Sequence, residues 1–310
     1  MAMNNSVGGI NVKERKKISA FKKRERRTAL LFIAPMYVQF IVFTLFFLGY
    51  SLYMSFTDWN IVAGTKNFIA FENFVQILKD PIFWKSVWNT VYLMIGIPIG
   101  MFLALLMAMA LNRKLPGKTI FRVSVYLPAV TSAMAIVILW RFIYNAEYGV
   151  INLVIQQLTG EAGPNWLGDP AMVKISLIIM GVWRGVGNTM ILFLAGLQNV
   201  PRDYYEVVDV EGGNSLHKFR YVTLPMLSSV TFYVLITGVI GGLQAFGDQF
   251  IMTGAGPEHS AITIVYYLWQ KGFAEYDMGG ASAVSWIVAV MIFVVTLIQF
   301  KLSNRWVYED

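Results

Sequence analysis

Cysteine is absent from the 310 residues, and histidine occurs only twice. Without thiols the chain has no disulfide framework, no thiolate metal site and no cysteine nucleophile. The GxSxG, HExxH and glycine-rich dinucleotide-binding patterns, which mark common hydrolase, metalloprotease and dehydrogenase sites, are also missing. We therefore expect neither catalytic residues nor metal ligands, and no enzymatic activity in this chain.

Charged residues are scarce as well: they make up 14% of the sequence, where a soluble protein carries about a quarter. Long apolar runs replace them, and about 20 apolar residues in a helix suffice to cross a bilayer. We predict an all-α integral membrane protein with six transmembrane helices in one domain, residues 28–304, between a basic segment at 1–27 and a tail at 305–310. The predicted spans are 28–56, 87–111, 123–144, 171–197, 226–253 and 281–302.

The net charge of +7 follows a topological pattern. Eighteen of the 25 Lys and Arg residues lie in 12–27, in the loops after the second and fourth runs, and after the sixth run, whereas the other loops hold four. Cytoplasmic loops carry this excess, so both termini are predicted to be cytoplasmic. The basic charge is then explained without a nucleic-acid partner. His217 and His259 fall on opposite sides of the membrane and are not expected to share a metal ion.

One short segment partly matches the sequence pattern of a nucleotide-binding loop. Residues 116–119 read PGKT, but the glycine that a phosphate-binding loop needs five residues before the GK pair is replaced by Asn112. The segment also follows a membrane helix instead of a strand. We therefore do not expect this chain to hydrolyse ATP by itself.

The loop between the fourth and fifth runs is unusually charged, reading YYEVVDVEGGNSLHKFRYVTLPML at 204–227. Gly212 and Gly213 can supply the positive φ angles that end a helix tightly. Asn214 or Ser215 can then cap a second short helix. The pattern predicts a helical hairpin at the membrane face.

Apolar side chains remain on this water-facing hairpin, and Leu224-Pro225 is predicted to end its second helix before the fifth span. A solvent-facing apolar surface commonly waits for a partner, although any cytoplasmic loop can be charged and helical. The apolar residues are Val207, Val208, Val210 and Phe219.

The hairpin resembles the EAA loop of permease subunits of ABC importers. The matching residues are Pro201, Glu206, Gly212, Phe219, Val222, Leu224 and Pro225. The chain departs from the family pattern at three places: Val207-Val208 replace two alanines, Glu211 replaces aspartate, and Gly213 replaces alanine. Further stretches resemble the carbohydrate-type permeases in the same order: ENFVQILKDPIFWKSVWNT, LPAV, NWLGDP, LQNVP, MTGAGP and GGASAVSW.

This resemblance implies the type I importer permease fold in the plasma membrane of a bacterium or archaeon. It also implies a second, commonly different, permease subunit, two cytoplasmic ATPase subunits that hold ATP and magnesium, and an extracellular solute-binding protein. The chain itself would need no cofactor and would form half of the pathway for a carbohydrate, with an oligosaccharide expected. The residues expected to couple it to the ATPase are Glu206, Val207, Val208, Glu211, Gly212, Gly213, Leu224 and Pro225.

Polar residues inside the spans are candidates for solute contact, because they commonly face a cavity or a partner. Gln244 and Asp248 lie four apart and are expected to share a face of the fifth span. Arg184 is expected to form a structural pair or to contact the partner permease, and Arg141 can extend to the membrane surface. Polar residues can equally join helices to one another. The candidate sugar contacts are Asn188, Gln244, Asp248, Tyr233 and Trp183.

Two alternatives stay open on the sequence alone. A permease of the same class could import another solute such as glycerol phosphate, which would favour more basic residues than Arg141 and Arg184. A secondary transporter or channel would act without ATP. It would often show inverted repeats and acidic ion-coupling residues within the spans, and it would not need the hairpin.

Overall fold

The computed structural model describes residues 12–113 and 116–308, which divide into two compact units, residues 1–54 and 55–310. The first unit contains α1 (Val12–Gln39), a π-helical segment η1 (Phe40–Leu45) and α2 (Phe46–Met54). Its stretch from Glu25 to Met54 is 30 residues long and apolar enough to cross a membrane. No described side chain in that stretch is buried within the chain.

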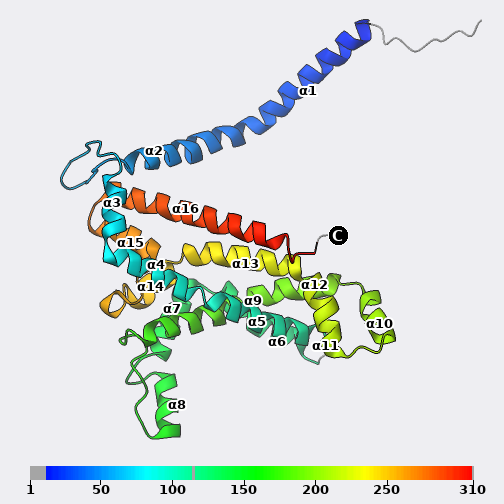
Figure 1. Cartoon of the computed structure of the whole chain (residues 1–310), viewed down its shortest axis with the longest axis vertical. Helices are drawn as coiled ribbons and strands as arrows, with labels where there is room; N and C mark the ends of the chain where they lie inside the picture. The colour runs from blue at the N-terminus through cyan, green and yellow to red at the C-terminus, as the bar shows by residue number, and fades with distance from the viewer. Residues whose placement is uncertain (1–11, 114–115, 309–310) are drawn as a thin grey trace, which may run out of the picture. The chain divides into compact units, whose positions relative to one another are not determined.

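The second unit is a bundle of helices with a polar hairpin at one end (Figure 1). In the described residues, four helices of the chain can span a membrane, or six when each of two bent pairs counts as one span. The all-α membrane architecture is thus confirmed, and the predicted number of spans equals the larger count. The bundle helices are α4 (Pro81–Leu93), α5 (Gly96–Leu111), α6 (Lys118–Val130), α7 (Ala133–Ile143), α9 (Met172–Asn199), α13 (Ser228–Leu243) and α16 (Met278–Ser303).

Two predicted spans are not continuous helices. The axis turns by 100° between α6 and α7, where Thr131 is extended (φ −78°, ψ 149°). The segment predicted at 226–253 bends by 60° near Leu227, and α13 then ends at Leu243 before a separate helix α14 (Gly247–Thr253) begins. Hydropathy averaged over a span does not detect such breaks, because the few polar residues at them, Thr131, Ser132 and Gln244, are outweighed by apolar neighbours.

The first outer loop contains a short helix, α3 (Glu72–Lys79). The Asp80 carboxylate accepts a hydrogen bond from the backbone N–H of Ile82 at 2.8 Å and so caps α4. Pro81 occupies the first turn, where its missing N–H has no intrahelical partner to lose. The sequence Lys-Asp-Pro therefore ends one helix and starts the next.

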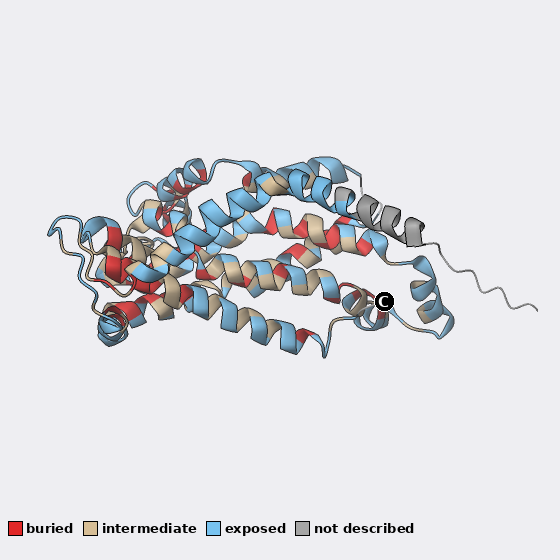
Figure 2. Cartoon of the chain, turned by 90° about the horizontal axis from the view of Figure 1, so that it is seen from above, coloured by how far each residue is buried: buried red, intermediate tan, exposed pale blue. Residues whose placement is uncertain are grey.

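The core of the second unit gathers on α9, which packs along α5 and α6. Gly187 allows the closest approach: a β-carbon there would collide with the carbonyl oxygen of Val125 on α6. A second cluster joins α7 to α9, and a third joins α4, α15 (Ile264–Trp269) and α16 at the end opposite the hairpin. Much of the outer helical surface is exposed in the single chain (Figure 2), as expected of helices that face lipid or partner subunits.

Candidate functional site

The first arm of the hairpin is α10 (Arg202–Val210), which starts after Pro201. It ends in a Schellman motif, in which Gly213 N–H donates to the Val208 carbonyl at 2.8 Å and Gly212 N–H donates to the Asp209 carbonyl at 3.0 Å. Gly212 has φ +75°. Gly213 does not have a positive φ, so the prediction that both glycines supply one is wrong for the second.

Gly213 is needed for a different reason, namely the side chain of Val208. A β-carbon at position 213 would collide with Val208 Cγ1. Relative to the EAA pattern, the chain has a larger residue at one alanine position, Val208, and a smaller residue at another, Gly213. The two departures, Val208 and Gly213, compensate each other within one contact.

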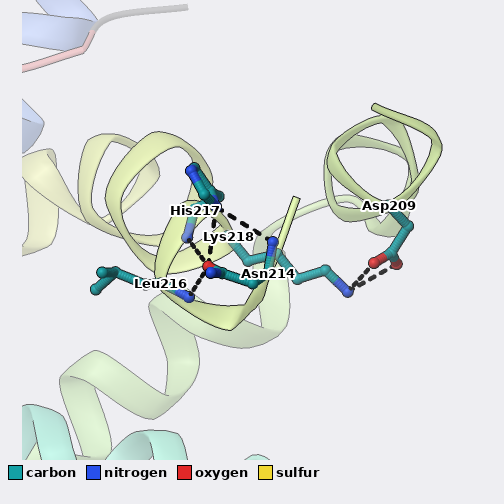
Figure 3. A network of polar contacts seen from close by, with 5 residues as sticks. All are labelled: Asp209, Asn214, Leu216, His217 and Lys218. Carbon is teal, nitrogen blue, oxygen red and sulfur yellow. Dashed lines mark hydrogen bonds and ion pairs between the residues drawn. The ribbon is translucent and has the colours of Figure 1, made fainter. Parts of the chain in front are cut away.

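The second arm starts with α11 (Ser215–Lys218) and is capped by Asn214, one of the two predicted caps. The Asn214 Oδ1 atom accepts hydrogen bonds from the N–H groups of Leu216 at 3.0 Å and His217 at 3.1 Å (Figure 3). The ammonium of Lys218 lies 2.6 Å from the carboxylate of Asp209 on α10 (Figure 3). This ion pair joins the two arms, and the sequence pattern did not predict it.

The second arm of the hairpin stays helical up to Met226, next to the fifth span. A π-helical segment η2 (Phe219–Thr223) leads into α12 (Leu224–Met226), so the predicted helix end at Leu224-Pro225 is wrong. The chain bends only after α12. Within this junction Thr223 is buried, and its hydroxyl lies 3.1 Å from the Tyr205 hydroxyl of α10. Because these residues are 18 positions apart, sequence spacing could not pair them.

The outer surface of the hairpin is apolar and uncovered. Val207 is 61% exposed and Val210 is 86% exposed, whereas the predicted Val208 and Phe219 are half-buried inside the hairpin. Leu216 and Tyr221, which the sequence interpretation missed, are 69% and 65% exposed. Two acidic residues of the hairpin, Glu206 and Glu211, are exposed and make no hydrogen bond or ion pair in the described part of the chain. Such a surface suits a docked protein partner.

A cavity of about 340 Å³ lies between α5, α9 and α13, and we call it the span cavity. Five of its fourteen lining residues are glycine, and a β-carbon added at Gly181 or Gly185 would meet no atom within 4 Å. Asn188, Thr189 and Thr237 supply its polar groups. Hydroxyl and amide groups beside open backbone could hydrogen-bond an uncharged polar solute.

The other predicted sugar contacts do not all share this cavity. Trp183 lines a second cavity of about 310 Å³ between α6, α7 and α9, and its ring lies 5.5 Å from the ring of Trp140. Tyr233 is exposed on α13, one turn before Thr237. Of the five candidates, Asn188 is the one that lines the span cavity.

Arg184 and Asp248 form an ion pair with 2.6 Å between Nη1 and Oδ1, which agrees with the first of the two roles expected for Arg184. Gln244 is exposed and follows the last residue of α13, and Asp248 lies beyond the break, in α14. The expectation that Gln244 and Asp248 share one helical face is therefore wrong. The guanidinium of Arg141 reaches the carbonyl of Ile251 at 3.5 Å.

A membrane bundle with cavities between its spans and an uncovered helical hairpin at its cytoplasmic end is the architecture of a transporter's membrane subunit. The chain belongs to the family of binding-protein-dependent transport system inner membrane components, whose pattern matches residues 96–308. It is therefore a multi-pass membrane protein and a permease of the ABC importer class.

Curated relatives match over most of their length. The arabinooligosaccharides transport system permease of Bacillus subtilis is 34% identical over 282 residues, covering 88% of each chain. The lactose transport system permease of Rhizobium radiobacter is 32% identical over 296 residues, covering 93% of this chain and 97% of the relative.

A solved structure has the same fold. It is a bacterial ABC transporter involved in the import of the acidic polysaccharide alginate, and one of its chains matches with a TM-score of 0.81 and 21% identity. The match covers 92% of this chain and 99% of that one. The predicted type I importer permease fold is thereby confirmed.

Proposed function

We propose that this chain forms one half of the translocation pathway of an ATP-driven importer of a carbohydrate, with an oligosaccharide as the expected solute. Permeases named for arabinooligosaccharides and lactose transport are among its relatives. The span cavity supports the same solute class, because its polar groups are an amide and two hydroxyls without a charge.

The hairpin docks an ATPase subunit in this proposal. The observation that carries it is the uncovered apolar surface of Val207, Val210, Leu216 and Tyr221, held by the Schellman turn and the Asp209–Lys218 ion pair. A hairpin fixed by these contacts, and joined to α13 through helical segments with one bend at Leu227, transmits a displacement better than a flexible loop. ATP-driven closure of the docked subunits would then move α9 and α13 and alternate access to the pathway.

Catalysis belongs to the partners in this account. Two ATPase subunits bind ATP and magnesium, a second and different permease supplies the other half of the pathway, and an extracellular binding protein delivers the solute. Glu206 and Glu211, exposed on the hairpin, are proposed to meet polar or basic groups of the ATPase groove.

A carbohydrate is favoured over a phosphate ester such as glycerol phosphate. A phosphate needs cationic ligands, and the guanidinium of Arg184 is already paired with Asp248. The other intramembrane arginine, Arg141, bonds a backbone carbonyl. The polar groups of the span cavity are neutral.

Co-purification tests the proposal. The chain, expressed with the proteins encoded beside it, should purify with an ATPase, a second permease and a solute-binding protein, and the reconstituted complex should take up the sugar of that binding protein only with ATP. Uptake by the chain alone, driven by an ion gradient without nucleotide, would contradict it. A binding protein loaded with a phosphate ester would refute the carbohydrate assignment alone.

A further inference from the structure

The helix α8 (Val150–Thr159) has two unlike faces. It contains no charged residue, and positions 150, 153, 154 and 158 follow helical spacing along one side. Four residues of that side are apolar and exposed, Val150 50%, Leu153 51%, Val154 48% and Leu158 80%, and the exposed Gln157 lies among them. We call these four residues the α8 stripe.

The opposite side of α8 is fixed to the protein in its first turn. Asn152 is buried, and its Nδ2 group donates to the carbonyls of Ala146 at 3.0 Å and Pro164 at 3.1 Å. Its Oδ1 atom accepts a hydrogen bond from Trp166 Nε1 at 2.7 Å. Ile151 packs against the cluster that joins α7 to α9. The stripe therefore cannot turn inward without breaking these contacts.

The direction of α8 differs from that of the spans. In Figure 1, α8 runs across the direction shared by α9, α13 and α16 and extends away from them, at the end of the bundle opposite the hairpin. The distribution of Lys and Arg assigns this end to the outer side. A helix that lies across the spans at this level is parallel to the membrane surface.

We propose that α8 is an interfacial helix whose stripe is seated in the outer leaflet of the bilayer. The lipid surface that surrounds the spans is continuous with it, and Tyr148, exposed before the helix, and Trp166 at its base are residue types that favour this level. The charges nearest to the helix in sequence, Glu147 and Glu161, lie outside it and are acidic, and the basic Arg141 lines a pocket with Glu147 and Tyr148. Because α8 itself carries no charge, its binding is driven by burial of apolar surface.

Placement of α8 in the outer leaflet has a mechanical consequence. Because Asn152 and Trp166 connect α8 to the chain on either side of it, lipid contact by α8 holds the outer ends of α7 and α9 at a constant depth. The cytoplasmic ends of the spans, which carry the hairpin, can then move relative to this fixed outer end.

The absence of cysteine permits a direct test. Leu158→Cys on the stripe and Gln156→Cys on the opposite side are each labelled with a nitroxide in the complete transporter, with partner subunits freed of cysteine, in phosphatidylcholine bilayers. Collisions with oxygen and with a water-soluble nickel chelate are measured by electron paramagnetic resonance. We expect the Leu158 label to be oxygen-accessible, shielded from nickel and about 5–10 Å deep, and the Gln156 label to be nickel-accessible.

Two results would overturn the inference. Equal nickel access at both labels would place the stripe in water. Shielding of the Leu158 label from oxygen and nickel alike would show that a protein subunit covers it. Neither readout depends on the transported solute, so the inference can fail while the proposed function stands.

Discussion

Arg184 of α9 and Asp248 of α14 form a 2.6 Å ion pair across the break that ends the fifth span. Both side chains are partly buried, with 32% and 19% of their surfaces exposed. A charge left without a partner inside a membrane bundle costs roughly 3 kcal/mol or more. The pair therefore holds α14 against α9 and decides the position of the carboxylate.

Removal of one member should destabilise the protein more than removal of both. We expect Arg184→Met to lower the melting temperature of the purified complex, and Arg184→Met combined with Asp248→Leu to recover most of that loss. Uptake should remain reduced in the double variant, because it lacks the carboxylate predicted to bind sugar hydroxyls. A double variant no more stable than Arg184→Met would show that the pair does not act as a unit.

The contact between Val208 and Gly213 predicts a compensated substitution. Gly213→Ala alone should overpack the turn and cost about 1–3 kcal/mol of unfolding free energy. Val208→Ala in the same chain removes the closest contact, that with Cγ1, and should recover part of the loss, since the tight contact with the Val208 carbonyl remains. Denaturation of the four variants in a double-mutant cycle measures the coupling. Additive effects of the two substitutions would contradict the contact.

Gly212 tests whether the hairpin transmits the ATP cycle. Proline cannot adopt the φ of +75° found at this position, so Gly212→Pro should open the Schellman turn. We expect the variant to insert in the membrane normally but to lose solute-stimulated ATP hydrolysis in the reconstituted complex. Glu206→Lys should lose it as well. Normal stimulation in both variants would mean that the hairpin is not the coupling element.

A large side chain placed at a glycine that lines the span cavity should block solute transport by filling the cavity. Gly185→Leu places a side chain in open space, so it should abolish uptake with little change in melting temperature. Ala195→Leu, an equal change at an exposed position of the same helix outside the cavity lining, provides the control and should transport normally. Undiminished uptake by Gly185→Leu would exclude the span cavity from the pathway.

Much of this structure could be predicted from sequence because it depends on local patterns. Apolar length identified the spans. Gly212, through its positive φ, and Asn214, through its side-chain cap, marked helix ends. The breaks at Ser132 and before Gly247 were missed, since hydropathy averages over them.

Contacts between distant positions were missed for a different reason. The Tyr205–Thr223 hydrogen bond joins residues that no periodic pattern relates. The span cavity depends on how α5, α9 and α13 pack, so its lining could not be predicted beyond Asn188. Gln244 was misplaced by the assumption of one continuous helix.

The central claim, that the hairpin docks an ATPase, is tested most directly by cross-linking. A cysteine introduced at Val210, 86% exposed on the hairpin, is treated with a bifunctional reagent in inverted membranes that contain the complete transporter, beside a cysteine at exposed Asn304 as control. The account predicts a product joining Val210→Cys to the ATPase subunit, diminished by excess unlabelled ATPase added before assembly. Cross-linking at Val210 no greater than at Asn304 would contradict it.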